Sequence, residues 1–156
     1  MIEIEVPGYR KLALQHLVLD YNGTLACHGT LLPGVRERLG VLADHLTVHV
    51  LTADTFGTAR SGLGGVACEL TILPSAGQAE AKVAFVRGLG AEGAACIGNG
   101  MNDRLMLEAS ALGIAVIQEE GAASQTLLAA QVVCRDIRDA LDLLLIPLRL
   151  AATLRG

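Results

Sequence analysis

Residues 17–24 read LVLDYNGT, and this stretch decides the fold class. The apolar run 17–19 predicts a buried strand, and Asp20 ends it just before the turn-forming pair Asn22-Gly23. An apolar strand without polar alternation is typical of a parallel sheet that is covered on both faces. The stretch therefore predicts a central strand that carries a carboxylate to the edge of the sheet.

Further apolar runs of the same kind follow, and helical patterns lie between most of them. The expected strands are 17–20, 48–51, 68–73, 94–98 and 113–117. The expected helices are 34–43, 79–87, 102–111 and 124–130. This alternation predicts an α/β fold: a doubly wound, Rossmann-like parallel sheet with helices on both faces.

The two ends of the chain add smaller elements. The residues of 3–14, with Pro7-Gly8 at their centre, predict an N-terminal β-hairpin. Segment 137–154 is helical by composition and apolar on nearly every face, and Pro147 should kink or split it. Such a helix needs cover on more than one side. The sheet supplies one side, and the other is either buried within the monomer or covered by a second subunit.

Length and composition exclude several classes of protein. The 156 residues suit a single domain, 1–156, and a hydrophobic content of 52% excludes a disordered chain. No uncharged apolar run is long enough to span a bilayer, and the N-terminus is charged from its third residue, unlike a signal peptide. We therefore expect a cytoplasmic protein with no membrane partner. A net charge of -4 and only four aromatic residues of the Phe and Tyr type argue against a nucleic-acid partner.

Two features resemble functional motifs but do not predict a function. The four cysteines lie far apart without a CxxC pair, so we expect small buried apolar residues rather than a zinc ribbon or a thioredoxin motif. Segment 88–93 matches GxGxxG, but here a helix precedes the glycines and a strand follows them. A dinucleotide-binding loop has the opposite order, so these glycines are expected to end a helix.

Polar residues follow three of the expected strands and meet at one edge of the sheet, because ligands of such sheets bind at the carboxyl ends of the strands. They are Asp20-Tyr21-Asn22-Gly23-Thr24, Thr52-Ala53-Asp54 and 98–103 (GNGMND). Lys82, one of only two lysines, lies in the helix before the fourth strand. A carboxylate nucleophile, free backbone amides, a hydroxyl, an ammonium and oxygen ligands for Mg²⁺ are the parts that phosphoryl transfer needs.

DYNGT, Thr52, Lys82 and GNGMND resemble, in the right order, the four motifs of the haloacid dehalogenase (HAD) superfamily. The resemblance covers about 11–135, and GNGMND is most similar to the GDGxND motif of P-type ATPases and their soluble relatives. It implies a Mg²⁺-dependent phosphatase-type hydrolase acting on a small phosphorylated substrate through an aspartyl-phosphate. The transporter domains of those ATPases are absent, so an ion pump is not expected.

The resemblance also implies a role for each matching residue. Asp20 is the expected nucleophile. The catalytic set is Asp20, Asn22, Thr52 and Lys82. The substrate-binding set is Tyr21, Asn22, Gly23, Thr52, Ala53 and Lys82. The Mg²⁺ ligands are Asp20, Asn22, Asn99 and Asp103.

Two positions depart from the phosphatase pattern. Asn22 stands where the family has its acid–base aspartate, and Asn99 where it has a metal-binding aspartate. Both keep an oxygen but lose the charge and the ability to transfer a proton. Slow turnover is therefore expected, and the alternative is a catalytically weakened phosphate-binding or regulatory protein. A receiver-like phosphoacceptor is less favoured, because that fold carries its aspartate on a later strand.

The motif spacing leaves no room for a cap domain. Asp20 and Thr52 are 32 residues apart, and Thr52 and Lys82 are 30 apart. The one flap candidate is 25–32, with a turn at His28-Gly29, and His28 either reaches substrate or is a loop residue without a role. A capless site, together with the apolar C-terminal helix, predicts a homo-oligomer, dimer or tetramer, in which a neighbour covers the site.

Overall fold

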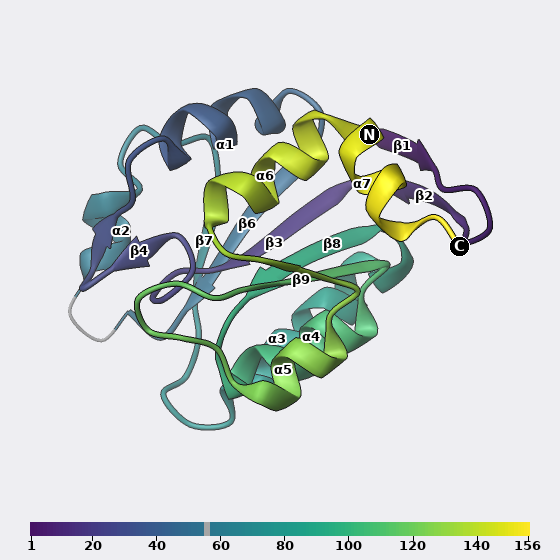
Figure 1. Ribbon diagram of the computed structural model, residues 1–156. Coiled ribbons are helices and arrows are strands. Elements are labelled where there is room, and N and C mark those ends of the chain that lie inside the picture. Colours follow the sequence, from purple (N-terminus) through teal and green to yellow (C-terminus); the bar gives the residue numbers. More distant parts are fainter. Residues whose placement is uncertain (55–56) are drawn as a thin grey trace.

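A parallel sheet of six strands, in the order β10-β9-β8-β3-β6-β7, forms the centre of the protein (Figure 1). The computed structural model describes residues 1–54 and 57–156. The strands are β3 (His16–Asp20), β6 (Thr47–Thr52), β7 (Glu69–Ile72), β8 (Ala94–Gly98), β9 (Leu112–Val116) and β10 (Val132–Cys134). The predicted α/β class and the parallel sheet are confirmed.

Helices cover both faces of the sheet (Figure 1). One face carries α1 (Val35–Ala43) and α6 (Ile137–Leu145), and the other carries α3 (Gln78–Leu89), α4 (Arg104–Ala109) and α5 (Ser124–Ala129). Neighbouring residues of a strand point to opposite faces. Leu17 and Leu19 therefore join the core under α1 and α6, and Val18 joins the core under α3 and α4. This double burial is why β3 is apolar throughout.

The predicted elements at the two ends are present. β1 (Ile2–Glu5) and β2 (Lys11–Leu14) form an antiparallel hairpin. The C-terminal segment is split into α6 and α7 (Pro147–Leu154), with Pro147 in the first turn of α7. Proline is tolerated there because an N–H in the first helical turn has no intrahelical partner. The apolar face of α6 packs within the chain against α1 and the sheet, whereas Leu148 of α7 is 82% exposed.

Sequence reasoning missed the short elements. These are α2 (Thr58–Gly62) and the edge strand β10, with five and three residues, which are too short to show a periodic pattern. The predicted flap is a small hairpin, β4 (Ala26–Cys27) and β5 (Thr30–Leu31). The predicted helix 102–111 begins as a 3₁₀ turn, Met101–Asp103, before α4. Another 3₁₀ turn, Ala91–Gly93, leads into β8.

The order of the strands decides where a ligand can bind. From β3 the chain moves outward to β6 and β7, and it then returns to β8 on the other side of β3. β3 and β8 therefore flank the point where the winding reverses, and in open α/β sheets this is where ligands bind, at the carboxyl ends of the strands. Among the described residues, no helix is long and apolar enough to cross a membrane.

Candidate active site

Asp20 lies at the carboxyl end of β3, where it meets a fully buried lysine. The Lys82 Nζ atom donates to Asp20 Oδ1 at 2.6 Å and to Asp103 Oδ1 at 2.7 Å. Lys82 reaches this position from α3, and Asp103 from the loop after β8. Three residues that are far apart in the sequence thus form one charged cluster beneath the edge of the sheet.

Burial decides the electrostatics of the cluster. It raises the pKa of Asp20 to about 7, the charge of Asp103 adds to this rise, and Lys82 opposes it. Burial alone would lower the pKa of Lys82, but the two carboxylates raise it above its ordinary value. Two carboxylates face a single ammonium, so the fully ionised cluster carries one net negative charge. A cation placed beside Asp20 would favour its charged form.

Asp103 organises the loop after β8. Its second oxygen, Oδ2, accepts hydrogen bonds from the backbone amides of Asn99 and Gly100, each at 2.9 Å. A side chain at Gly98 could not fit, because a Cβ atom there would lie 2.4 Å from Asp103 Cγ. The side chain of Asp103 is fully buried and both its oxygens already accept hydrogen bonds. Its predicted role as a direct Mg²⁺ ligand stays a prediction.

Thr52 ends β6 next to Asp20. Its hydroxyl accepts a hydrogen bond from the Asp54 amide at 3.2 Å, and no described residue accepts its hydrogen. The hydroxyl hydrogen is therefore available to a ligand. Asp54 has a φ of 38°, and its carboxylate accepts a 2.8 Å bond from the Ala59 amide at the start of α2. The short helix α2 thus fixes the loop that follows Thr52.

A cleft of about 380 Å³ opens above these residues. It is lined by eight residues of the predicted strand-end motifs and by three others. The first group is Asp20, Asn22, Thr52, Ala53, Asp54, Asn99, Gly100 and Asn102, and the second is Thr58, Gln78 and Glu120. The structure therefore brings the predicted strand ends together at one opening, as the sheet topology requires.

Tyr21 and Gly23 do not present free groups to this cleft. The Tyr21 side chain is fully buried, and its hydroxyl donates to the carbonyl of Gly29 at 3.0 Å, beneath the flap. The Gly23 amide already donates to the Ala26 carbonyl at 2.8 Å. Gly23 is nevertheless required as glycine, since its φ is 80° and a Cβ atom would lie 2.3 Å from Glu120 Oε2. These two residues shape the loop after Asp20.

Residues after β9 also belong to the site, and sequence reasoning missed them. Gln118 donates to the carbonyls of Gly23 and Thr24 at 3.2 and 2.9 Å, which holds the loop after Asp20. Glu120 lines the cleft. The signal that could have found them is the rule used for the other strands, because both lie within three residues of the end of the expected strand 113–117.

Sequence comparisons connect the chain with two small archaeal proteins. No family model matches it. It is 58% identical over 59 residues to the uncharacterized protein MJ0073 of Methanocaldococcus jannaschii, an alignment that covers 38% of this chain and 63% of that protein. It is 44% identical over 39 residues to the uncharacterized protein MJ0072 of the same organism, covering 25% of this chain and 89% of that protein. The chain belongs to one family with MJ0072.

Solved structures identify the fold. The 3-deoxy-D-manno-octulosonate 8-phosphate phosphatase of Moraxella catarrhalis, determined with magnesium and phosphate ions, superposes with a TM-score of 0.66 at 15% identity over 85% of this chain and 86% of that one. The cobalt-bound enzyme YrbI of Haemophilus influenzae gives 0.66 at 19% identity over 85% and 87%. The Yersinia pestis enzyme gives 0.66 at 19% identity over 99% and 95%. The chain has the HAD fold.

The donors at the cleft fit the cation that HAD phosphatases use. Asp20, Asn22 and Asn99 all line the cleft, and carboxylate and amide or carbonyl oxygens are the ligands that Mg²⁺ prefers. Thr24 Oγ1 lies 3.4 Å from Asp20 Oδ2 and 3.3 Å from Asn99 Oδ1. The Thr24 hydroxyl therefore lies within hydrogen-bond distance of two of the oxygens that could bind the cation. The uncompensated negative charge of the cluster also suits a divalent cation.

Proposed function

We propose that the protein is a Mg²⁺-dependent phosphohydrolase that works through an aspartyl-phosphate on Asp20. The observation that carries the proposal is the buried bridge from Lys82 to Asp20 and Asp103 at the floor of the cleft. The bridge fixes one oxygen of Asp20, and the carboxylate still lines the opening. Thr52 supplies a free hydroxyl beside it for a phosphoryl oxygen. The likeness of GNGMND to soluble relatives of P-type ATPases belongs to the same proposal.

In the proposed reaction a carboxylate oxygen of Asp20 attacks phosphorus, and the bond from phosphorus to the ester oxygen breaks. The leaving oxygen takes a proton from water, because the carboxamide of Asn22 cannot donate one as a carboxylic acid does. Water then cleaves the aspartyl-phosphate and releases phosphate. Mg²⁺, held by Asp20, Asn22 and Asn99, would offset the charge of the phosphoryl oxygens.

The cleft also favours a class of substrate. Asp54 and Glu120 line it, and among the described residues that line it none is lysine or arginine. A second anionic group on the substrate would find only negative charge there, because Lys82 is buried beneath Asp20. We therefore propose an uncharged leaving group, such as a neutral sugar, rather than a carboxylated sugar like that of the octulosonate phosphatases.

The test is a phosphatase assay over phosphorylated metabolites, with and without Mg²⁺. It uses the wild type, Asp20→Asn and the surface control Asp139→Asn. We expect Mg²⁺-dependent hydrolysis that favours neutral sugar phosphates, is abolished in Asp20→Asn and is retained in Asp139→Asn. Activity that survives in Asp20→Asn would contradict the assignment.

The second candidate function is a phosphate-binding or regulatory protein with a weakened site. Asn22 and Asn99 favour it, because both line the cleft and both carry amides where the resemblance implies carboxylates. The same assay decides between the two functions. Saturable phosphate binding without turnover on any substrate would support the second candidate.

A further inference from the structure

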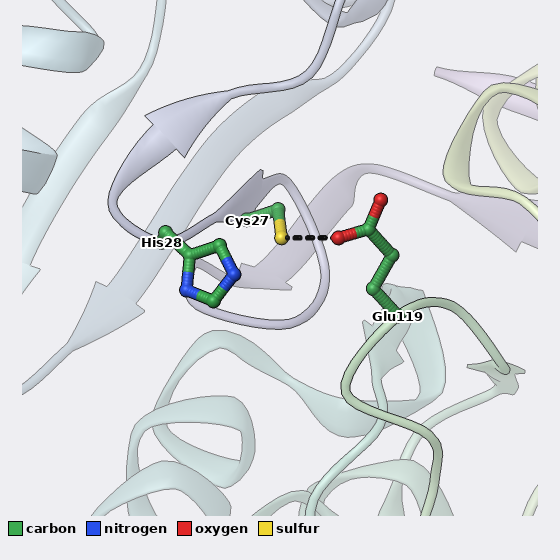
Figure 2. A group of neighbouring side chains, drawn as sticks. All are labelled: Cys27, His28 and Glu119. Carbon is green, nitrogen blue, oxygen red and sulfur yellow. Dashed lines mark hydrogen bonds between the residues drawn. The ribbon is translucent and has the colours of Figure 1, made fainter.

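A second group of metal-binding side chains lies at the tip of the flap. Cys27 and His28 come from the β4–β5 hairpin, and Glu119 comes from the loop after β9 (Figure 2). Their sulfur, nitrogen and oxygen atoms all lie within 4.8 Å of one another. The Cys27 thiol donates to Glu119 Oε2 at 2.9 Å. Two segments 92 residues apart in the sequence thus meet through donor atoms of three kinds.

The backbone of the hairpin explains how two neighbouring residues reach the same point. Consecutive side chains of an extended strand point to opposite sides. His28 has a φ of 50° and Gly29 a φ of 78°, so both central residues of the turn are left-handed. The left-handed conformation at His28 breaks the alternation and turns the imidazole towards the thiol (Figure 2). The Tyr21 hydroxyl fixes the turn from beneath through Gly29.

The charge at this point is negative and lacks a partner. Glu119 and its neighbour Glu120 form no ion pair with any residue that the structure describes. A cation would relieve this charge and take the place of the thiol proton.

We propose that Cys27, His28 and Glu119 form a binding site for Zn²⁺ or a transition-metal ion of similar softness. Thiolate, imidazole and carboxylate are the zinc ligands of proteins, whereas Mg²⁺ does not favour thiolate. Tetrahedral zinc needs donor atoms about 3.3–3.8 Å apart. The side chains of His28 and Glu119 are exposed, and closing a spacing of at most 4.8 Å to this range takes a shift of about 1.5 Å or less.

Three protein ligands leave the fourth position to water. Binding converts the Cys27 thiol to a thiolate, so one proton is released for each ion bound, and no oxidation takes place. The bound ion would join the flap to the loop after β9. That loop also holds Gln118, which fixes the carbonyls of Gly23 and Thr24, and Glu120, which lines the cleft. The site therefore lies where an ion would restrain the flap beside the opening of the cleft.

The experiment is a titration of the full, tag-free chain with Co²⁺, in buffer that contains excess Mg²⁺. Cobalt bound to a thiolate gives a near-ultraviolet charge-transfer band, so the readout reports the cysteine directly. We expect one equivalent to bind, and Zn²⁺ to displace it. Cys27→Ser should abolish the band, and His28→Asn and Glu119→Gln should weaken binding at least about tenfold.

Two controls isolate the site. Cys134→Ser removes another half-buried cysteine and should leave the band unchanged. Asp20→Asn should also leave it unchanged, so a failure of the proposed phosphatase function does not affect this test. His28→Asn keeps a residue that tolerates the left-handed backbone, which separates loss of the imidazole from loss of the turn.

A wild type that shows no saturable band, or a band that persists in Cys27→Ser, would overturn the proposal. Hydrogen exchange tests the restraint of the flap. Saturating Zn²⁺ should slow exchange at residues 25–32 in the wild type and not in Cys27→Ser. Equal exchange with and without Zn²⁺ in the wild type would show that the bound ion does not restrain the flap.

Discussion

Lys82 is the residue on which the charge balance of the site depends. It is a long side chain with no exposed surface, and it reaches the carboxyl end of the sheet from the helix layer. The two short hydrogen bonds of Lys82 offset the cost of burying its charge, because an unpaired buried ammonium would strongly destabilise the fold. The same bonds hold Asp20 and Asp103 close together although their charges repel. Lys82 therefore contributes to the stability of the fold as well as to the site.

Replacing Lys82 by methionine should lower the free energy of unfolding by about 3–5 kcal/mol. The substitution keeps most of the volume, but it leaves two buried carboxylates without their partner. The matched control is Lys11→Met on the surface, whose ion pair with Glu3 is more than half exposed. The control should cost less than about 1 kcal/mol. Urea denaturation of the two variants measures the difference, and equal losses would contradict the role given to Lys82.

Asn22 is the second residue whose replacement is informative. Asn22 lines the cleft, its carboxamide has no acid–base capacity, and Asn22→Asp restores a carboxyl group of nearly the same shape. We expect this substitution to raise Mg²⁺-dependent hydrolysis of an aryl phosphate at least about tenfold. The gain should fall short of the full effect of acid–base catalysis, because Asn99 still lacks charge. Steady-state kinetics without any gain would show that Asn22 does not occupy the acid–base position.

At the scale of elements, strand β6 carries a buried histidine between two other titratable groups. His49 is 3% exposed, its Nε2 lies 3.2 Å from Nδ1 of His16 in β3, and its Nδ1 lies 3.2 Å from Glu69 Oε2 in β7. The Phe85 ring of α3 packs against the His49 ring in a T-shaped arrangement, with 5.4 Å between the ring centroids. Burial lowers the pKa of His49, and Glu69 opposes this only in part. The fold therefore favours neutral His49.

His49 should make the free energy of unfolding fall as the pH is lowered. Its folded pKa is below the unfolded value of 6.5, so the unfolded chain takes up the proton first as the pH falls. Stability from this group is present above pH 6.5 and is lost below it. Asp20 contributes in the opposite direction, so the test compares the wild type with His49→Gln by urea denaturation across this range. The wild type should lose more stability on acidification than the variant, and parallel curves would contradict the prediction.

The elements that sequence predicts most directly are those that are almost fully buried. Four of the five expected strands, β3, β6, β8 and β9, are buried along nearly their whole length because helices cover both faces of the sheet. The fifth, β7, is only partly buried and contains Glu69 and Thr71, but it is present as well. The strand β10 was missed because Val133 and Cys134 are partly exposed and the strand is three residues long. The flap was predicted from one turn, His28-Gly29, since a left-handed pair closes a two-residue hairpin. Patterns therefore failed where elements are short and half exposed.

The same limit applies to the site. Asp20, Thr52 and Asn99 could be predicted because each follows a strand that sequence reveals, and parallel strands end at one edge. The bridge from Lys82 depends on how α3 packs, which no local pattern encodes. Lys82 was expected in the site through the family resemblance alone. The flap-tip group was not predicted, because Cys27 and Glu119 are brought together only by the fold.

At the scale of the whole molecule, the open cleft and the exposed apolar surface of the C-terminus lie at opposite ends of the sheet. The cleft lies where β3 ends, at Asp20. Helix α7 contacts β1, whose partner β2 leads into the beginning of β3 (Figure 1). A neighbour bound to α7 would therefore leave the cleft of that protomer open. The capless site and the apolar helix are two separate arguments for assembly.

The remaining prediction is the homo-oligomer, and its interface should include α7. Leu148 is 82% exposed and Ile146 is 40% exposed, although Leu150, Ala151 and Leu154 pack within the chain. Covering these side chains in a stable assembly requires an interface of more than about 1,000 Å² in total. Light scattering of the wild type at micromolar concentration should give a dimer or tetramer, and Leu148→Asp should give a monomer because it places a charge in the apolar contact. Since α7 is remote from Asp20, kcat/KM on the best substrate of the panel should be equal in both proteins. A wild type that is monomeric would contradict the predicted homo-oligomer. If Leu148→Asp is monomeric and also loses activity, a neighbouring subunit does complete the site.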